Sequence, residues 1–187
     1  NEMVEVVVPP STETPEEVQE GVARKIADAE WEVNQVSDAI TWKYYHFNDL
    51  FSSNQSVTVI EVDLNKNPVV DIPYVTSGFL KTSDAAIDAK AVAAVNGSFF
   101  DTSEGGSTVF FRKDGEIINY TRNGFTPYRE NAGFAIDAEG AISIVKRPTS
   151  GWETVEVATL LASGPLLVFD GEALDQVQQS FNTNRHP

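Results

Sequence analysis

The sequence predicts an α+β fold: a mostly antiparallel sheet with an N-terminal amphipathic helix and one short helix packed on it. The first observation is a stripe of apolar residues, three or four positions apart, between Val18 and Ile40. The second is an alternating apolar pattern that begins at residue 56. The third is a set of turn dipeptides between apolar runs: Asp114-Gly115, Glu139-Gly140 and Asp170-Gly171.

The first helix is expected to follow Thr14, a good N-cap that precedes Pro15 at the first helical position. Glu17 completes a Thr-x-x-Glu capping box. The apolar stripe predicts a helix that continues to about residue 46. An aromatic cluster at its end is the expected docking point of the helix: Trp42, Tyr44, Tyr45 and Phe47.

The rest of the chain reads mainly as strands. Strands are expected over 56–64, 67–75 and 91–95, with a short helix capped by Ser83 between the last two. Two hairpins should follow, and then one or two strands interrupted at Ser163-Gly164-Pro165. We therefore divide the chain into an N-terminal arm and helix (1–50) and a second domain (51–187).

Composition excludes several classes of function. A net charge of -15 repels nucleic acid and anionic membranes, and no apolar stretch is long enough to span a bilayer. Without cysteine there is no thiol catalysis, disulfide or cysteine-bound zinc. His46 and His186 lie far apart in the sequence, so a metal site would rely on carboxylates and favour calcium or magnesium. No cofactor is otherwise indicated, and the oligomeric state stays open.

The stretch "AVNGSFFDTSEGGS", residues 94–107, permits two interpretations. Asn96-Gly97 is a common hairpin turn, because both residues tolerate positive φ. Alternatively, a buried strand delivers Asn96 and Asp101 to a cleft, where Gly97, Gly105 and Gly106 let backbone N–H groups approach an anion or a sugar. Spacing alone favours the turn.

Several segments in order resemble the phosphodiester glycosidase family, the family of the enzyme that uncovers mannose 6-phosphate. They are "AVNGSFFD", a glycine-rich step into "STVFFRKDGEI", "GFAIDAEGAISI", "LASGPLLVFDGE" and the terminal "RHP". The resemblance runs from about residue 56 to the C-terminus, so the N-terminal segment is expected to be a bacterial addition. In the family an Arg-Thr pair and Asp-Gly-rich segments follow the His-Pro position. We therefore expect residues 51–187 to be only the N-terminal portion of such a domain, which leaves the activity of this chain open.

The resemblance implies a hydrolase that removes an N-acetylglucosamine-like sugar from a phosphodiester. The implied substrate is a small molecule or glycan that carries phosphate. The implied location of the protein is secreted, periplasmic or at the cell surface. The implied catalytic residues are Asn96 and Asp101. The implied substrate-binding residues are Gly97, Phe99, Gly106, Ser163, Gly164, Arg185 and His186.

Several of these residues also have a structural interpretation. Asp101 can cap local N–H groups in a turn, Ser163-Gly164 can form a bulge, and Arg185 and His186 can belong to an untethered tail. Three other arginines are expected to be surface charges, unless one of them reaches the cleft: Arg112, Arg122 and Arg129.

The alternative function is a glycan-binding module of the cell envelope that does not turn its ligand over. Such a module would use an exposed aromatic platform built from Trp42, Trp152 and Tyr128.

Overall fold

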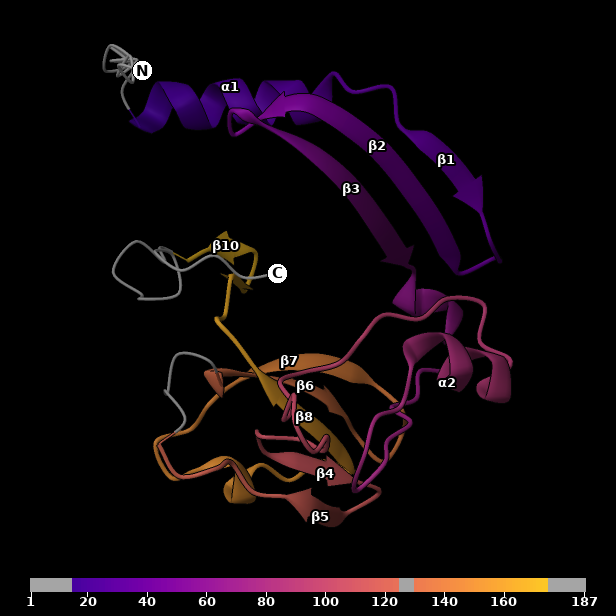
Figure 1. The fold of residues 1–187 in the computed structure, drawn as a ribbon, viewed down its shortest axis with the longest axis vertical. Coiled ribbons are helices and arrows are strands. Elements are labelled where there is room, and N and C mark those ends of the chain that lie inside the picture. The colour runs from indigo at the N-terminus through magenta and orange to yellow at the C-terminus, as the bar shows by residue number, and fades with distance from the viewer. Residues whose placement is uncertain (1–14, 125–129, 175–187) are drawn as a thin grey trace, which may run out of the picture. The chain divides into compact units, whose positions relative to one another are not determined.

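The computed structural model describes residues 15–124 and 130–174, and the chain forms two compact units, Asn1–Lys66 and Asn67–Pro187 (Figure 1). Every strand pair named below is antiparallel. The described residues also contain two α-helices. This is the α+β class that the sequence predicts. None of the helices in the described ranges has the length and apolar character needed to cross a bilayer.

The first unit contains one helix and a three-stranded sheet of order β1-β2-β3. Its elements are α1 (Pro15–Ala27), β1 (Glu32–Gln35), β2 (Ile40–Leu50), β3 (Ser53–Val62) and a 3-10 turn, η1 (Leu64–Lys66). The predicted strand at 56–64 is therefore present and begins slightly earlier. Residue 50 ends β2, and β3 pairs with β2 along its length, so β3 belongs to this first unit.

The predicted helix to residue 46 is wrong, because α1 ends at Ala27 and two strands follow it. The segment "ITWKYYHF" is rich in β-branched and aromatic residues, which favour strands when a partner is available. Strand β2 finds that partner on both sides: Trp42 pairs with Asn34 of β1 and with Ile60 of β3. Backbone pairing with the strands before and after β2 thus overrides the helical spacing of its apolar residues.

The aromatic cluster lies on β2 and is divided between the two faces of the sheet, as strand alternation requires. Tyr45 and Phe47 pack against Trp31, with ring centroids 6.0 and 5.8 Å away. The Trp31 indole N–H donates a 3.2 Å hydrogen bond to the carbonyl of Ile26 in the last turn of α1. Tyr45 and Phe47 therefore anchor the chain just after the helix, through Trp31.

The second unit contains a five-stranded sheet of order β5-β4-β8-β6-β7 and a separate two-stranded ribbon (Figure 1). Its elements are α2 (Thr82–Ala89), β4 (Phe111–Lys113), β5 (Glu116–Asn119), β6 (Ala132–Ile136), β7 (Ile142–Lys146), η3 (Trp152–Thr154), β8 (Thr159–Ser163), β9 (Val168–Phe169) and β10 (Glu172–Ala173). Strand β8 is central and pairs with β4 on one side and with β6 on the other.

The three predicted hairpin turns are confirmed. Asp114-Gly115 connects β4 to β5 and has positive φ at both residues, 51° and 85°. Asp170-Gly171 connects β9 to β10 with φ of 51° and 80°. Residues 137–141 connect β6 to β7, with φ of 87° at Gly140. These turns rest on local backbone preferences, which explains why short sequence motifs find them.

Three expected local features are absent from the structure. Neither 67–75 nor 91–95 forms a strand, and Val92 and Val95 are 59% and 74% exposed. Asn96 therefore does not follow a buried strand. The residue preceding α2 is Lys81, and the Ser83 hydroxyl bonds to the Asp84 carboxylate instead of capping the helix.

The core of the second unit lies against β8. Six buried residues form it: Val109, Phe110, Ala135, Trp152, Leu160 and Ala162. Gly133 on β6 is part of this packing, since a Cβ there would lie 2.7 Å from Leu160 Cδ1 and 3.1 Å from Trp152. Trp152 is 2% exposed, so it cannot belong to an exposed aromatic platform.

Candidate functional site

The Ser163-Gly164 break lies at one end of the five-stranded sheet, where β8 ends and β6 begins. Ser163 is paired with Ala132, and Asn131 accepts a 2.7 Å hydrogen bond from the backbone N–H of Leu166. The Asn131 side chain thus holds the chain just beyond the break. We call this the motif end of the sheet, defined by Ala132 and Ser163.

The loop that begins at Asn96-Gly97, which we call the Asn-Gly loop, lies against the motif end. The Ser98 hydroxyl donates a 2.6 Å hydrogen bond to the carbonyl of Ala162, the residue before Ser163. A Cβ on Gly97 would lie 3.4 Å from a methyl group of Leu161, so the loop backbone runs close to β8. Asn96 is exposed at the start of the loop, and Phe99 packs against the core. The structure therefore brings together two segments that are more than 60 residues apart in the sequence.

Asp101 closes the loop by accepting hydrogen bonds from its neighbours. Its Oδ1 accepts from the N–H groups of Ser103 and Glu104, at 2.8 and 3.1 Å. Its backbone carbonyl accepts from Gly105, and its N–H donates to the carbonyl of Gly106, at 2.8 and 3.0 Å. The turn-capping interpretation of this acid is therefore confirmed.

The other Asp101 oxygen, Oδ2, forms an ion pair with Arg122 Nη1. The Arg122 guanidinium and then the Ser103 and Glu104 N–H groups lower the pKa of Asp101 to about 2. The Arg122 backbone N–H donates to the carbonyl of Thr108, at 3.0 Å, which fixes the start of its side chain. Near neutral pH Asp101 is thus a carboxylate with both oxygens bonded, which makes it unsuited to proton donation.

The glycine pair in the loop, Gly105 and Gly106, has a structural role. Gly105 and Gly106 have φ of 78° and 77°, a region that side chains disfavour. A Cβ on Gly105 would lie 1.8 Å from the carbonyl oxygen of Gly78, with which it forms a parallel bridge. A Cβ on Gly106 would lie 3.3 Å from the carbonyl oxygen of Thr76. The pair therefore allows close backbone contact with residues 76–78, and its role toward a ligand remains a prediction.

A buried carboxylate that the sequence did not single out also lies at the motif end. Glu130 is 2% exposed and pairs with Arg147 Nη1 at 3.2 Å. The Thr121 hydroxyl donates to Glu130 Oε2 and accepts from the N–H of Phe110 at 3.0 Å. Thr121, which bonds to Glu130, directly precedes Arg122, which pairs with Asp101, so consecutive residues contact the two carboxylates. No local pattern around Glu130 indicates its burial.

Arg112 is not the surface charge that was expected. It is buried, and its guanidinium donates to the carbonyls of Val155 and Glu153, the second at 3.2 Å. Its Cζ lies 5.6 Å from the centre of the Phe110 ring. This arginine therefore secures the segment before β8. Arg129, Tyr128, Arg185 and His186 lie outside the described residues.

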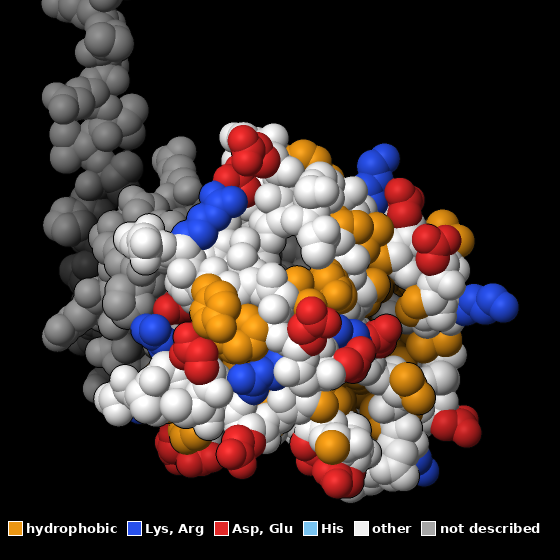
Figure 2. Space-filling view, turned by 90° about the horizontal axis from the view of Figure 1, so that it is seen from below, with side chains coloured by type: hydrophobic (Ala, Val, Ile, Leu, Met, Phe, Trp, Pro, Cys, Tyr) orange, Lys and Arg blue, Asp and Glu red, His pale blue; other side chains and the backbone are white. Residues whose placement is uncertain are grey.

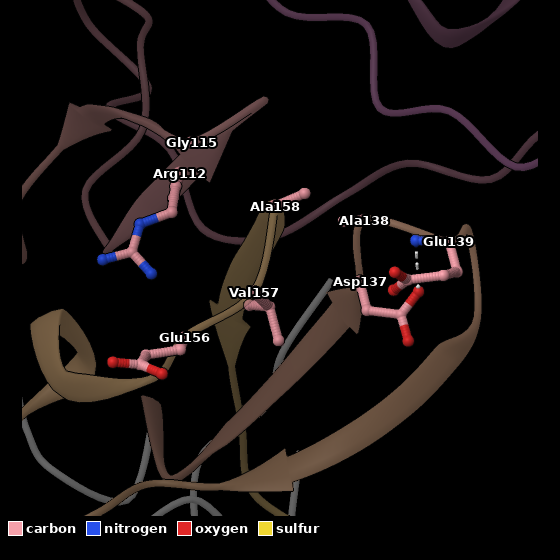
Figure 3. Close-up of a pocket in the computed structure, with 8 residues that line it drawn as sticks. All are labelled: Arg112, Gly115, Asp137, Ala138, Glu139, Glu156, Val157 and Ala158. Atoms are coloured by element: carbon pink, nitrogen blue, oxygen red, sulfur yellow. Dashed lines mark hydrogen bonds between the residues drawn. The ribbon is translucent and has the colours of Figure 1, made fainter.

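A shallow pocket of about 390 Å³ lies at the opposite end of the sheet (Figure 3). Its lining comprises Arg112, Gly115, Asp137, Ala138, Glu139, Glu156, Val157 and Ala158. Asp137 accepts the Glu139 N–H, and the Glu156 carboxylate points away from both (Figure 3). Among the described residues no three acidic or histidine side chains converge as metal ligands. No ligand set for calcium or magnesium can therefore be named in this part of the chain.

A comparison with known families gives one match. The family model described as phosphodiester glycosidase matches residues 89–187, more than half of the chain. The match covers the Asn-Gly loop, Arg122, Glu130 and the Ser-Gly break, and it leaves the segment between residues 56 and 88 outside. No curated protein and no solved structure matches the chain.

Proposed function

The chain belongs to the phosphodiester glycosidase family, and we propose that it hydrolyses the bond between an N-acetylglucosamine-like sugar and the phosphate of a phosphodiester. In this reaction the bond from the anomeric carbon to the phosphate oxygen breaks, and the phosphate monoester leaves with the electron pair. The oxygen of water bonds to the anomeric carbon and its proton is released. The phosphate is a good leaving group, so binding of its charge matters more than general-acid help.

The observation that carries the proposal is the Ser98–Ala162 hydrogen bond. It holds the loop that begins at Asn96-Gly97 against the strand that ends at Ser163. In the proposed site Asn96 donates to a sugar hydroxyl or a phosphate oxygen, and Ser163 and Gly164 offer a hydroxyl and a backbone N–H. Gly97, Phe99 and Gly106 shape the loop. All of these residues fall within the family match.

Two roles are open to the Asp101 carboxylate in this site. It can stabilise the positive charge that develops on the sugar ring, since its lowered pKa keeps it ionised near neutral pH. It can also position Arg122. Both carboxylate oxygens already accept hydrogen bonds, which favours the second role.

The test uses the full chain and two small substrates. One is methyl N-acetylglucosamine 1-phosphate, a phosphodiester, and the other is the methyl glycoside, which has no phosphate. Release of N-acetylglucosamine from the first and not from the second is the expected result. Failure to release sugar from the phosphodiester would overturn the proposal.

One observation favours a glycan-binding module instead: the loop carboxylate is fully engaged in the structure. In that case the phosphodiester would bind, measured by calorimetry, and no sugar would appear. Either function fits glycans of the cell envelope or the environment, and we propose an extracytoplasmic setting on that ground.

A further inference from the structure

We propose that Arg122 binds the phosphate group of the substrate and that Asp101 is the residue that positions its guanidinium. This inference deepens the proposed function and rests on it for the identity of the ligand. It assigns the loop acid a role through another side chain, in place of direct contact with the sugar.

The net charge of the chain means that binding of a phosphate group needs a local cation. The chain has a net charge of -15, so its overall field does not attract a phosphodiester. Acidic and basic side chains are interspersed on the face in Figure 2, with no broad basic patch. An anionic ligand therefore needs a local cation. Arginine suits it best, because its planar fork of N–H groups matches two phosphate oxygens.

The described residues of the second unit include three arginines, and they differ in how their guanidinium groups are engaged. Arg112 is buried and donates to two backbone carbonyls. Arg147 is paired with the buried carboxylate of Glu130. Arg122 differs from both, since its side chain is 49% exposed and one of its terminal nitrogens is held by Asp101. Arg122 is thus the described arginine of this unit best able to meet a ligand in solvent.

The placement of the Arg122 guanidinium is fixed. Asp101 Oδ1 is held by two backbone N–H groups of its own turn, so Oδ2 presents a rigid acceptor to Arg122. The backbone of Arg122 is tied to Thr108, whose N–H donates to the carbonyl of Phe99. Both ends of the arginine side chain are therefore anchored to the loop that begins at Asn96. A pre-positioned arginine loses less freedom on binding than a mobile one.

The position of Arg122 in the fold also supports the proposal. Ser98 joins this loop to Ala162, next to Ser163, so the loop that anchors the guanidinium lies at the motif end. Thr121, which precedes Arg122, bonds to Glu130 at the same end. The arginine thus approaches the Asn-Gly and Ser-Gly segments from a third part of the chain. Its N–H groups that face away from Asp101 are the ones assigned to phosphate.

The experiment measures binding separately from turnover. The probes are N-acetylglucosamine 1-phosphate and N-acetylglucosamine, titrated calorimetrically into the full chain. Arg122→Gln should weaken binding of the phosphorylated sugar at least tenfold, and Arg122→Lys should weaken it less. Lys66→Gln is the matched control, because it removes one exposed positive charge from the first unit and should change the affinity less than twofold.

The positioning role of Asp101 has its own readout. Asp101→Asn should raise KM for the phosphodiester with a smaller change in kcat, and Asp101→Glu should restore part of the loss. The affinity for unphosphorylated N-acetylglucosamine should stay constant across these variants, which also verifies that they are folded. A loss of affinity for both probes together would contradict a phosphate-specific role.

The outcomes separate this inference from the proposed function. Wild-type affinity for the phosphorylated sugar in Arg122→Gln, or no phosphate-dependent affinity in the wild type, overturns the inference. Phosphate-dependent binding that needs Arg122 but yields no sugar release supports the inference and overturns the hydrolase proposal. Release that persists unchanged in Arg122→Gln supports the hydrolase and overturns the inference.

Discussion

The Ser98 hydroxyl donates a 2.6 Å hydrogen bond to the carbonyl of Ala162, across a sequence separation of 64 residues. This contact joins the Asn-Gly loop to the strand that carries the Ser-Gly break. The side chains proposed to bind the sugar and the phosphate then lie on segments that meet at one end of the five-stranded sheet.

Replacement of Asn96 tests the exposed amide at the start of the loop. Asn96→Ala should lower sugar release from the phosphodiester by about 100-fold, since it removes the amide that we propose donates to the sugar or the phosphate. The matched control is Asn54→Ala, which removes another exposed amide in the first unit and should leave release unchanged. Full activity in Asn96→Ala would remove this residue from the site.

The Asp101 ion pair predicts a specific pH dependence of stability. Arg122 and two backbone N–H groups lower the pKa of Asp101 from 3.8 to about 2. A carboxyl group with a lowered folded pKa stabilises the fold fully above its unfolded pKa, and this stabilisation is lost as pH falls through the folded value. The difference in urea midpoint between wild type and Asp101→Asn should therefore be largest near neutral pH and should vanish toward about pH 2.

Arg122→Gln serves as the control for this pH effect, because it removes the main cause of the lowered pKa. In that background the effect of Asp101→Asn should be smaller and should disappear at higher pH. An equal effect of Asp101→Asn in both backgrounds would show that the pair does not operate in solution.

The contact of Gly105 with Gly78 predicts a strongly destabilising substitution. Gly105→Ala places a Cβ against the Gly78 carbonyl at a positive φ, so we expect a loss of about 2 kcal/mol or more in the free energy of unfolding. Gly115→Ala is the control, with a similar φ but no atom within 4 Å, and should cost about 1 kcal/mol. Equal losses by urea denaturation would contradict the close contact.

The buried carboxylate of Glu130 predicts a dependence on hydrogen bonding. Glu130→Ala leaves Arg147 and the Thr121 hydroxyl without their acceptor, at a cost of about 2 kcal/mol. Glu130→Gln keeps one acceptor oxygen and should cost less. Glu156→Ala removes an exposed carboxylate and should change stability by less than about 0.5 kcal/mol. If all three variants unfold at one urea midpoint, Glu130 has no such role.

Features set by a few neighbouring residues were predictable from sequence. The hairpin turns at Asp114-Gly115 and Asp170-Gly171 were found because both positions need positive φ. The break after Ser163 was predictable because proline has no N–H to donate to a neighbouring strand, so Gly164-Pro165 does not continue a strand that is paired on both sides. In each case the physical cause lies within the motif itself. The family, too, was recognised from the order of such motifs, and the family model confirms it.

Backbone preferences and apolar alternation act over a few residues, so the α+β class, the turns and the motifs of the site can be predicted without the structure. The strand β2 could not be predicted in this way, since its residues have a helical spacing and become a strand through pairing with β1 and β3. Only the tertiary structure joined Asp101 to Arg122 and buried Glu130 beside Arg147. These outcomes depend on contacts between distant segments, whose partners no local pattern specifies.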